Sequence, residues 1–286
     1  MTLKKIIALV LACALLNCSF VSACAEKEDW WNILLLGTDN RDEQEGYSRT
    51  DSMIILSVNT QTNEAKLTSL MRDTWVKIEG HGSSKLNAAS VYGGPELTMQ
   101  TISNNFGVDI SDYMLINITG MADVIDVLGG IEMTITEAER KAINKGLFDL
   151  SSRSGMETLD SSGENVLLNG NQAVAYSRIR MIDSDYVRTE RQRAVLVKLA
   201  EKLKSEINMI TIAGLITSLL PYVETSLDLS DLISLATIGL KIDFASIDEL
   251  RLPADGTFES GTFNGTWCIK PNFEKNTAIL NDFIYG

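Results

Sequence analysis

The chain has 286 residues, of which 45% are hydrophobic and 22% charged, a balance typical of a globular protein and too apolar for wholesale disorder. Its formal net charge is −13, and the 38 acidic and 23 basic residues beyond residue 25 would alone give −15. This acidity disfavours nonspecific binding to nucleic acid or to an anionic membrane surface, so any bound anion must be held by a local cluster of basic side chains.

The chain begins with an export signal. Lys4 and Lys5 precede a mostly apolar stretch from 6 to 25. Three fates fit this segment. A small-x-small sequence ending at Ala25 resembles a signal peptidase site, the four residues ending at Cys24 resemble a lipobox, and an uncleaved run approaches the roughly 20 apolar residues that span a bilayer. We therefore expect an extracytoplasmic protein, either attached to the cell membrane by an anchor helix or by lipid on Cys24, or secreted after cleavage near Ala25.

The body of the chain, beyond the targeting segment, contains one cysteine, Cys268, and one histidine, His81. A disulfide framework and a histidine-rich metal site are therefore excluded, and the stability of the body must come from an ordinary core.

Short apolar runs and turn residues predict three strands near the start of the body. They cover residues 32–36, 53–58 and 65–71, and the polar turn 59–63 joins the last two in a hairpin.

The remainder alternates helices and strands, which predicts an α/β domain with a central sheet. In chain order we expect helices at 85–92 and 95–105, a strand at 113–118, a helix at 121–128, a strand at 131–135, a Ser- and Gly-rich excursion at 146–165, helices at 172–176, 190–207, 210–220 and 229–240, and a strand near 250–253. Neither an internal repeat nor a Pro- and Ser-rich linker divides the chain.

The predicted hairpin brings an acidic and a basic side chain together. If its turn centres on residues 61–62, the numbers of facing residues sum to 123, and Asp51 lies opposite Arg72. Cross-strand neighbours are about 5 Å apart at Cβ. An ion pair at one edge of the sheet is therefore expected.

A second basic cluster contains Arg178 and Arg180. If this segment is extended, both guanidinium groups share one face and lie roughly 7 Å apart, where they repel unless an anion or an acid neutralises them. Arginine is suited to bind phosphate oxygens through two hydrogen bonds. The alternative is a solvated strand edge paired with Asp183 and Asp185, and the residues alone favour neither interpretation.

Two further sets of polar residues have a structural and a functional interpretation. Residues 189–192 fit a capping box with Thr189 at the N-cap and Gln192 at N3, and a helix N-terminus also binds phosphate. Asp39 and Asp51 fit ordinary loop chemistry, but two carboxylates are also what Mg²⁺ takes together with water and substrate phosphate oxygens.

Successive blocks of the chain resemble the LytR–CpsA–Psr (LCP) family. The blocks are 32–39 (NILLLGTD), 49–53 (RTDSM), 69–74 (SLMRDT), 85–89 (KLNAA), 92–96 (YGGPE), 128–131 (LGGI), 168–180 (LNGNQAVAYSRIR) and 183–193 (DSDYVRTERQR). Each block is a weak signal, but together they follow the family order from about residue 32 to 205. Residues 206–286 resemble the end of the same domain, so we expect one LCP catalytic domain over 30–286.

The resemblance implies a phosphotransferase of cell-wall assembly. Its fold would be an α-β-α sandwich, with a mixed or mostly antiparallel sheet and an apolar pocket for a polyprenyl tail. It would move a glycopolymer such as teichoic acid or capsule from an undecaprenyl-pyrophosphate carrier to peptidoglycan at the membrane, with Mg²⁺, or alternatively Mn²⁺, as cofactor. The alternatives are a polyprenyl-pyrophosphate hydrolase and a non-catalytic binder or sensor of lipid-linked wall intermediates.

The resemblance also assigns roles to individual residues. Asp39 and Asp51 match the magnesium-linked aspartates. The pyrophosphate-binding set is Arg41, Arg49, Arg72, Lys85, Arg178, Arg180, Arg188 and Gln192. Asp51, Arg72 and Asp73 are the candidate catalytic residues, and either Asp51 or Asp73 would act as the base.

Overall fold

The computed structural model describes residues 29–38, 46–149, 157–182, 184–206, 216–217, 219–263 and 265–286. The predicted targeting segment with Cys24, and the candidate site residues Asp39 and Arg41, lie outside these ranges, as does Asp183. Within them, none of the helices combines the length and apolar character that crossing a bilayer requires.

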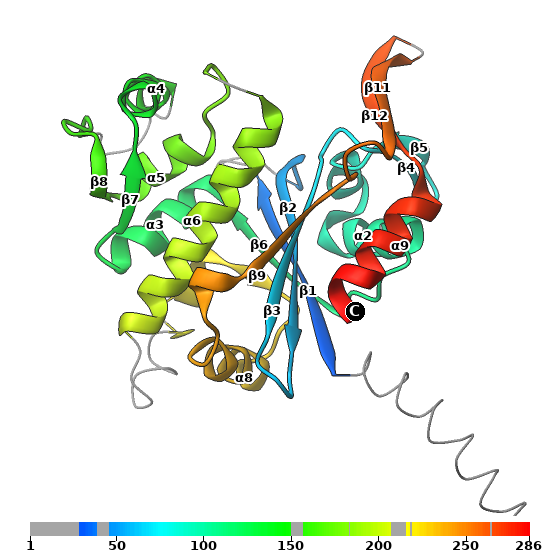
Figure 1. The fold of residues 1–286 in the computed structure, drawn as a ribbon, viewed down its shortest axis with the longest axis horizontal. Coiled ribbons are helices and arrows are strands. Elements are labelled where there is room, and N and C mark those ends of the chain that lie inside the picture. The colour runs from blue at the N-terminus through cyan, green and yellow to red at the C-terminus, as the bar shows by residue number, and fades with distance from the viewer. Residues whose placement is uncertain are drawn as a thin grey trace, which may run out of the picture.

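A six-stranded mixed sheet forms the centre of the molecule (Figure 1). In sheet order its strands are β10 (Asp248–Leu252), β3 (Ala65–Leu70), β2 (Thr50–Asn59), β1 (Trp30–Thr38), β6 (Asp112–Asn117) and β9 (Glu224–Thr225). The pairs β1–β2, β2–β3 and β6–β9 are antiparallel, whereas β1–β6 and β3–β10 are parallel. The predicted mixed sheet is confirmed.

The predicted register of the first hairpin is also confirmed. Ile54 pairs with Ser69 and Val58 pairs with Ala65, so facing residue numbers sum to 123. The start of β2 and the turn after β3 therefore lie at the same edge of the sheet.

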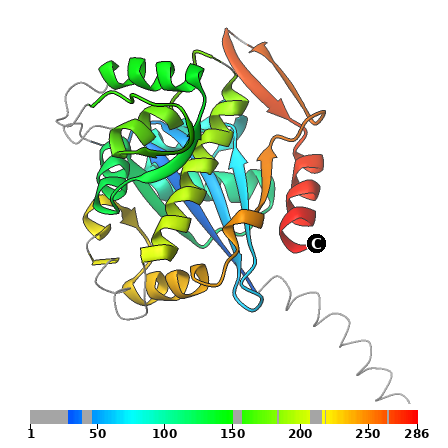
Figure 2. The ribbon, with the colours of Figure 1, turned by 60° about the vertical axis from the view of Figure 1, so that its left-hand side comes forward.

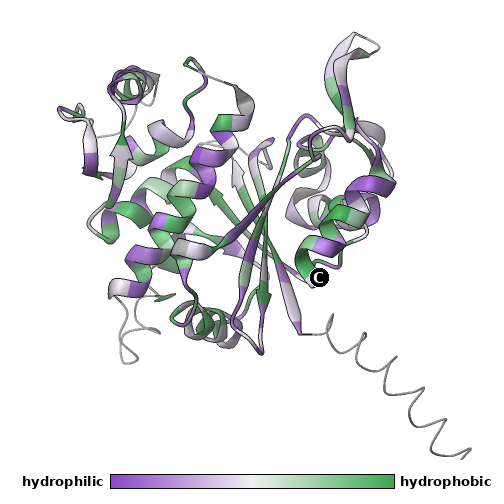
Figure 3. Cartoon of the chain, viewed as in Figure 1, coloured by the Kyte–Doolittle hydropathy of each residue, from purple (hydrophilic) through white to green (hydrophobic). Residues whose placement is uncertain are grey.

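Helices cover both faces of the sheet (Figures 1 and 2). One face carries α2 (Ala88–Phe106) and α9 (Phe273–Tyr285), and the other carries α3 (Ile118–Val127), α5 (Gly170–Ser177) and α6 (Asp185–Glu206). α8 (Leu229–Gly239) lies at the end of the molecule drawn lowest in both views. Hydrophobic and hydrophilic residues alternate along α6, as expected of a helix with one buried face (Figure 3).

Alternation along β1 separates two apolar regions. Leu34 and Leu36 are buried in the core formed with α2 and α9. Leu35 points to the opposite face, where it lines a cavity. Because successive strand residues face opposite sides of a sheet, the continuous apolar run of β1 contributes side chains both to this core and to the cavity on the other face.

Smaller elements complete the fold. Three two-stranded antiparallel sheets are formed by β4 (Trp75–Ile78) with β5 (Gly82–Lys85), β7 (Ile131–Ile135) with β8 (Gly163–Leu168), and β11 (Phe258–Phe263) with β12 (Thr266–Pro271). The first and the last are hairpins, whereas a helix separates β7 from β8 along the chain. The remaining elements are α4 (Glu137–Asp149), η1 (Leu220–Tyr222) and η2 (Phe244–Ser246).

Several predicted boundaries were wrong. The helix expected at 85–92 begins only at Ala88, because Lys85 ends β5. Gly93 and Gly94 then leave the helical conformation before Pro95, so the two predicted helices meet at a kink. The excursion expected at 146–165 overlaps the end of α4 and the start of β8. The helix expected at 210–220 falls largely outside the described residues, and 220–222 form a 3₁₀ turn.

The start of α6 also corrects a prediction. The helix begins at Asp185 rather than near 190, so Thr189 lies inside it and is not an N-cap. The Thr189 hydroxyl instead donates to the Tyr186 carbonyl oxygen at 2.7 Å. The predicted capping box at 189–192 is therefore wrong.

A buried ion pair ties α6 to α4. Arg191 Nε donates to Glu139 Oε1 at 3.0 Å, and Arg191 is 5% exposed. Burial tends to raise the pKa of Glu139, but hydrogen bonds from the Thr136 amide and hydroxyl and from Arg191 outweigh it and hold this pKa below its ordinary value.

We expect Glu139→Gln to lower the free energy of unfolding at pH 7 by about 2 kcal/mol, since it removes a charge-assisted bond to a buried guanidinium. A carboxylate with a lowered folded pKa stabilises the protein above its unfolded pKa of about 4.3 and loses that contribution as pH falls through the folded value. Urea unfolding of both proteins at pH 7 and pH 3 should therefore show a difference that narrows at pH 3. A difference that stays constant between the two pH values would contradict this account.

Candidate active site

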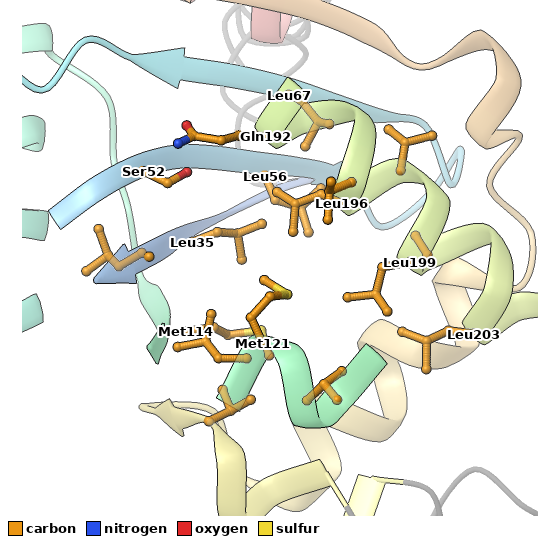
Figure 4. Close-up of a pocket in the computed structure, with 18 of the residues that line it drawn as sticks. Leu35, Ser52, Leu56, Leu67, Met114, Met121, Gln192, Leu196, Leu199 and Leu203 are labelled. Carbon is orange, nitrogen blue, oxygen red and sulfur yellow. The ribbon is translucent and has the colours of Figure 1, made fainter. Parts of the chain in front are cut away.

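An apolar cavity of about 440 Å³ lies between the sheet and the helices α3, α6 and α8. Leucine and methionine side chains from the sheet, α3 and α6 point into it (Figure 4), and Leu232 and Leu235 of α8 also line it. Those labelled there are Leu35, Leu56, Leu67, Met114, Met121, Leu196, Leu199 and Leu203. A cavity of this size and lining suits a long hydrocarbon better than a polar metabolite.

One end of the cavity is polar. Gln192 and Ser52 lie there, close to the strand ends, while the remaining labelled side chains are apolar (Figure 4). Five of the charged and amide side chains that line the cavity form what we call the mouth group: Asp51, Arg178, Arg180, Arg188 and Gln192.

A second charged set adjoins the mouth without lining the cavity. We call Arg72, Asp73 and Lys85 the outer group. Lys85 Nζ lies 2.7 Å from Asp73 Oδ1, and Arg72 Nε lies 3.5 Å from Asp73 Oδ2. These residues come from the turn after β3 and from the end of β5.

Asp51 connects the two groups. Arg72 Nη1 makes a short ion pair with Asp51 Oδ1, as the hairpin register predicted. Arg180 Nη2 lies 3.3 Å from both oxygens of the same carboxylate. The structure thus brings together residues more than a hundred positions apart, with two guanidinium groups on a single carboxylate.

The arginines that follow α5 are held differently from the prediction. Arg178 is the C-cap of α5, with φ −102° and ψ 0°, and its amide bonds to the Ala175 carbonyl oxygen. The prediction that Arg178 and Arg180 lie on an extended segment is therefore wrong, although both side chains line the cavity mouth. The alternative partner Asp183 lies outside the described residues, and Arg180 pairs with Asp51.

Arg188 is the most deeply buried charge of the mouth group. It lies in the first turn of α6, is 2% exposed, and lines the cavity. A buried guanidinium next to an apolar space favours an anion there, because an arginine does not lose its proton to reduce the cost of burial.

The segment that enters β2 carries Arg49, whose side chain is exposed. This segment is anchored by Tyr47, which the sequence did not identify. The hydroxyl of Tyr47 donates to Glu224 Oε1 on β9 at 2.8 Å, and this bond raises the pKa of Tyr47 to about 12. The Tyr47 ring packs so closely on Gly94 that a Cβ there would lie 2.5 Å from it. An aromatic residue between two polar blocks offered no sequence signal for this long-range contact.

The residues present fit a magnesium ion only in combination with other ligands. The described residues contain no group of three or more acidic, histidine or cysteine side chains that would hold a metal alone. Asp51 offers carboxylate oxygens at the mouth, and its predicted companion Asp39 lies outside the described ranges. One or two carboxylates with water and phosphate oxygens are the usual ligands of Mg²⁺.

Comparisons with known proteins agree with these features. A model of the LytR_cpsA_psr family matches residues 15–282. The polyisoprenyl-teichoic acid–peptidoglycan teichoic acid transferase TagU of Oceanobacillus iheyensis is 36% identical over 253 residues, or 85% of this chain and 71% of that protein. TagU of Enterococcus faecalis is 31% identical over 235 residues, or 81% and 72%.

Solved structures share the fold. Bacillus subtilis TagV matches with a TM-score of 0.72 and 25% identity, over 90% of this chain and 98% of that one. TagT with bound octaprenyl pyrophosphate lipid matches with a TM-score of 0.67 and 25% identity, over 91% and 92%.

Proposed function

Because this chain belongs to the LytR–CpsA–Psr family, we propose that it transfers a glycopolymer from a polyprenyl-pyrophosphate carrier to peptidoglycan. The substrate carries a long apolar tail, two phosphates and a sugar polymer. The acceptor is a hydroxyl group of the wall, and the product is a phosphodiester between polymer and wall.

One observation carries this proposal: the apolar cavity ends at a cluster of four cationic side chains in an acidic protein. Arg178, Arg180 and Arg188 line the cavity mouth, and Arg72 joins them through Asp51. A polyprenyl pyrophosphate has the matching order of parts, with its tail in the apolar space and its phosphates at the guanidinium groups.

The residues act on phosphoryl transfer mainly through charge and position. The acceptor oxygen attacks the sugar-side phosphorus in line with the departing lipid phosphate. The guanidinium groups at the mouth neutralise charge that builds on the phosphate oxygens. Of the two candidate bases, Asp73 lies outside the cavity lining whereas Asp51 lies within it, and we assign the acceptor proton to Asp73 because the attacking hydroxyl approaches from the side opposite the lipid.

Magnesium remains part of the proposal. Asp51 together with Asp39 would hold the ion, which when bound neutralises further charge on the pyrophosphate. The enzyme would act on the outer side of the cell membrane, where its lipid-linked substrate and wall acceptor meet. Its first 25 residues would either attach it to the membrane or be cleaved to release it.

Purified protein, a labelled polyprenyl-pyrophosphate-linked glycopolymer and peptidoglycan test this function directly. We expect label to appear in the wall fraction only with peptidoglycan present, to disappear with a chelator, and to return with Mg²⁺. Calorimetry should show Mg²⁺ binding that Asp51→Ala abolishes. Release of free polymer at the same rate without peptidoglycan would instead indicate a hydrolase, and binding without turnover would indicate a carrier or sensor.

A further inference from the structure

The hairpin β11–β12 stands out from the body at the end of the molecule opposite α8 (Figures 1 and 2). Its base is attached to the outer group. The Ile269 amide donates to the Asp73 carbonyl oxygen at 3.0 Å, and Ile269 pairs with Thr74 in a parallel bridge. The hairpin is therefore a direct extension of the turn that carries Arg72 and Asp73.

The two faces of this hairpin differ. On one face, Lys270 Nζ lies 3.6 Å from the centre of the Phe263 ring, and that ring also packs against Gly261. On the other face, Trp267 lies opposite Thr262. Trp267 is 48% exposed, and no ring contact within the described ranges covers it.

Trp267 lies on the strand whose backbone is attached to the outer group. It precedes Ile269 by two residues on the same strand, a distance of about 7 Å, and the Ile269 amide bonds to the backbone carbonyl of Asp73. The half-exposed indole offers a flat apolar face to a ligand, on a hairpin whose backbone is bonded to the turn that carries the candidate base.

In-line transfer decides which substrate approaches this ring. The lipid phosphate departs toward the cavity, which lies between the sheet and α3, α6 and α8. The attacking hydroxyl must arrive from the opposite side of the phosphorus. The hairpin stands on the α2 and α9 side of the sheet, away from the cavity (Figure 1).

We propose that Trp267 is a stacking platform for a sugar ring of the acceptor glycan, placing its hydroxyl group at the outer group. This inference rests on the proposed function and adds the acceptor subsite to it. The flat indole packs against the C–H face of a pyranose, a contact that requires no charge and suits an otherwise acidic surface.

Steady-state transfer by Trp267→Ala tests the platform. We expect KM for peptidoglycan glycan strands to rise about tenfold, while kcat and KM for the lipid-linked donor stay unchanged. Trp267→Phe should recover most of the affinity. Phe263→Ala, on the opposite face of the same hairpin, is the matched control and should leave the acceptor KM unaltered.

Intrinsic fluorescence gives a second measurement that does not depend on an alanine variant. Soluble uncrosslinked glycan strands should shift the tryptophan emission of the wild-type protein but not that of Trp267→Phe. An unchanged acceptor KM in Trp267→Ala, an equal rise in donor KM, or an emission shift caused by phospholipid vesicles and not by glycan would each overturn the proposal. If the wild-type protein moves no polymer to peptidoglycan, the proposed function itself fails, whatever Trp267 does.

Discussion

Arg72→Ala is expected to lower kcat/KM for polymer transfer by about a hundredfold to a thousandfold, the loss that follows removal of one preorganised donor from a developing oxyanion. Arg72 is the residue that joins both parts of the site, because it bonds to Asp51 at the mouth and to Asp73 outside it. In the proposed mechanism its removal takes away a phosphate ligand, and it leaves both carboxylates without one of their cationic partners. Transfer of labelled polymer to peptidoglycan measures the effect.

The same substitution should leave the fold intact. Lys85 still pairs with Asp73 and Arg180 still pairs with Asp51, so neither acid is left as an uncompensated charge. Arg72→Lys keeps the charge but loses the planar two-point geometry, and an intermediate rate is expected.

A matched control is Arg140→Ala, which also breaks an arginine–carboxylate pair, with Glu137 on α4, at a similarly accessible position where neither residue lines the cavity. It should transfer polymer at the wild-type rate. If purified Arg72→Ala and purified Arg180→Ala each transferred polymer at the wild-type rate, these residues would not form the active site.

The sequence correctly predicted strands and pairings that depend on residues close together in the chain. The hairpin of β2 and β3 has a five-residue polar turn, and its centre alone set the pairing of Ile54 with Ser69 and the contact of Asp51 with Arg72. The strand at Ile131–Ile135 matched residue for residue, because Gly129 and Gly130 end the preceding helix and alternation marks the strand itself.

The sequence did not predict the ends of the helices or the pairing of strands that are far apart in the chain. α6 begins at Asp185 rather than near 190, which changes the role of Thr189 from cap to interior residue. β10 joins β3 in parallel across nearly two hundred positions, and β12 bonds to the turn at Asp73. Such contacts depend on the packing of whole layers, which no single stretch of residues specifies.

The candidate site was predictable as a set of residues but not as an arrangement. Resemblance named Arg188 and Gln192, yet only the packed helices show that both face one cavity. The exposed Trp267 and the anchoring bond of Tyr47 to Glu224 carry no local sequence signal, because exposure and long-range hydrogen bonds are properties of the folded chain.

Ala200→Phe should separate the tail-binding part of the site from the head-group part. Ala200 lies on α6 and lines the cavity, so a phenyl ring there occupies space that the polyprenyl tail would fill. Excluding one five-carbon unit forfeits roughly 4 kcal/mol at about 0.8 kcal/mol per buried carbon. We therefore expect affinity for a long-chain polyprenyl pyrophosphate to fall at least about a hundredfold, measured by calorimetry in detergent.

The empty space in the cavity also predicts the thermal stability of Ala200→Phe and its binding of short-chain ligands. A ring that enters existing empty space forces no neighbour aside, so the midpoint of thermal unfolding should stay close to that of the wild-type protein. A five-carbon isoprenyl pyrophosphate should bind as before, because the arginines at the mouth are untouched. Ala278→Phe makes the same change on the exposed surface of α9, across the sheet, and should alter neither ligand. If Ala200→Phe binds the long-chain lipid normally, the tail does not occupy this space, and the cluster of arginines must serve a different anion.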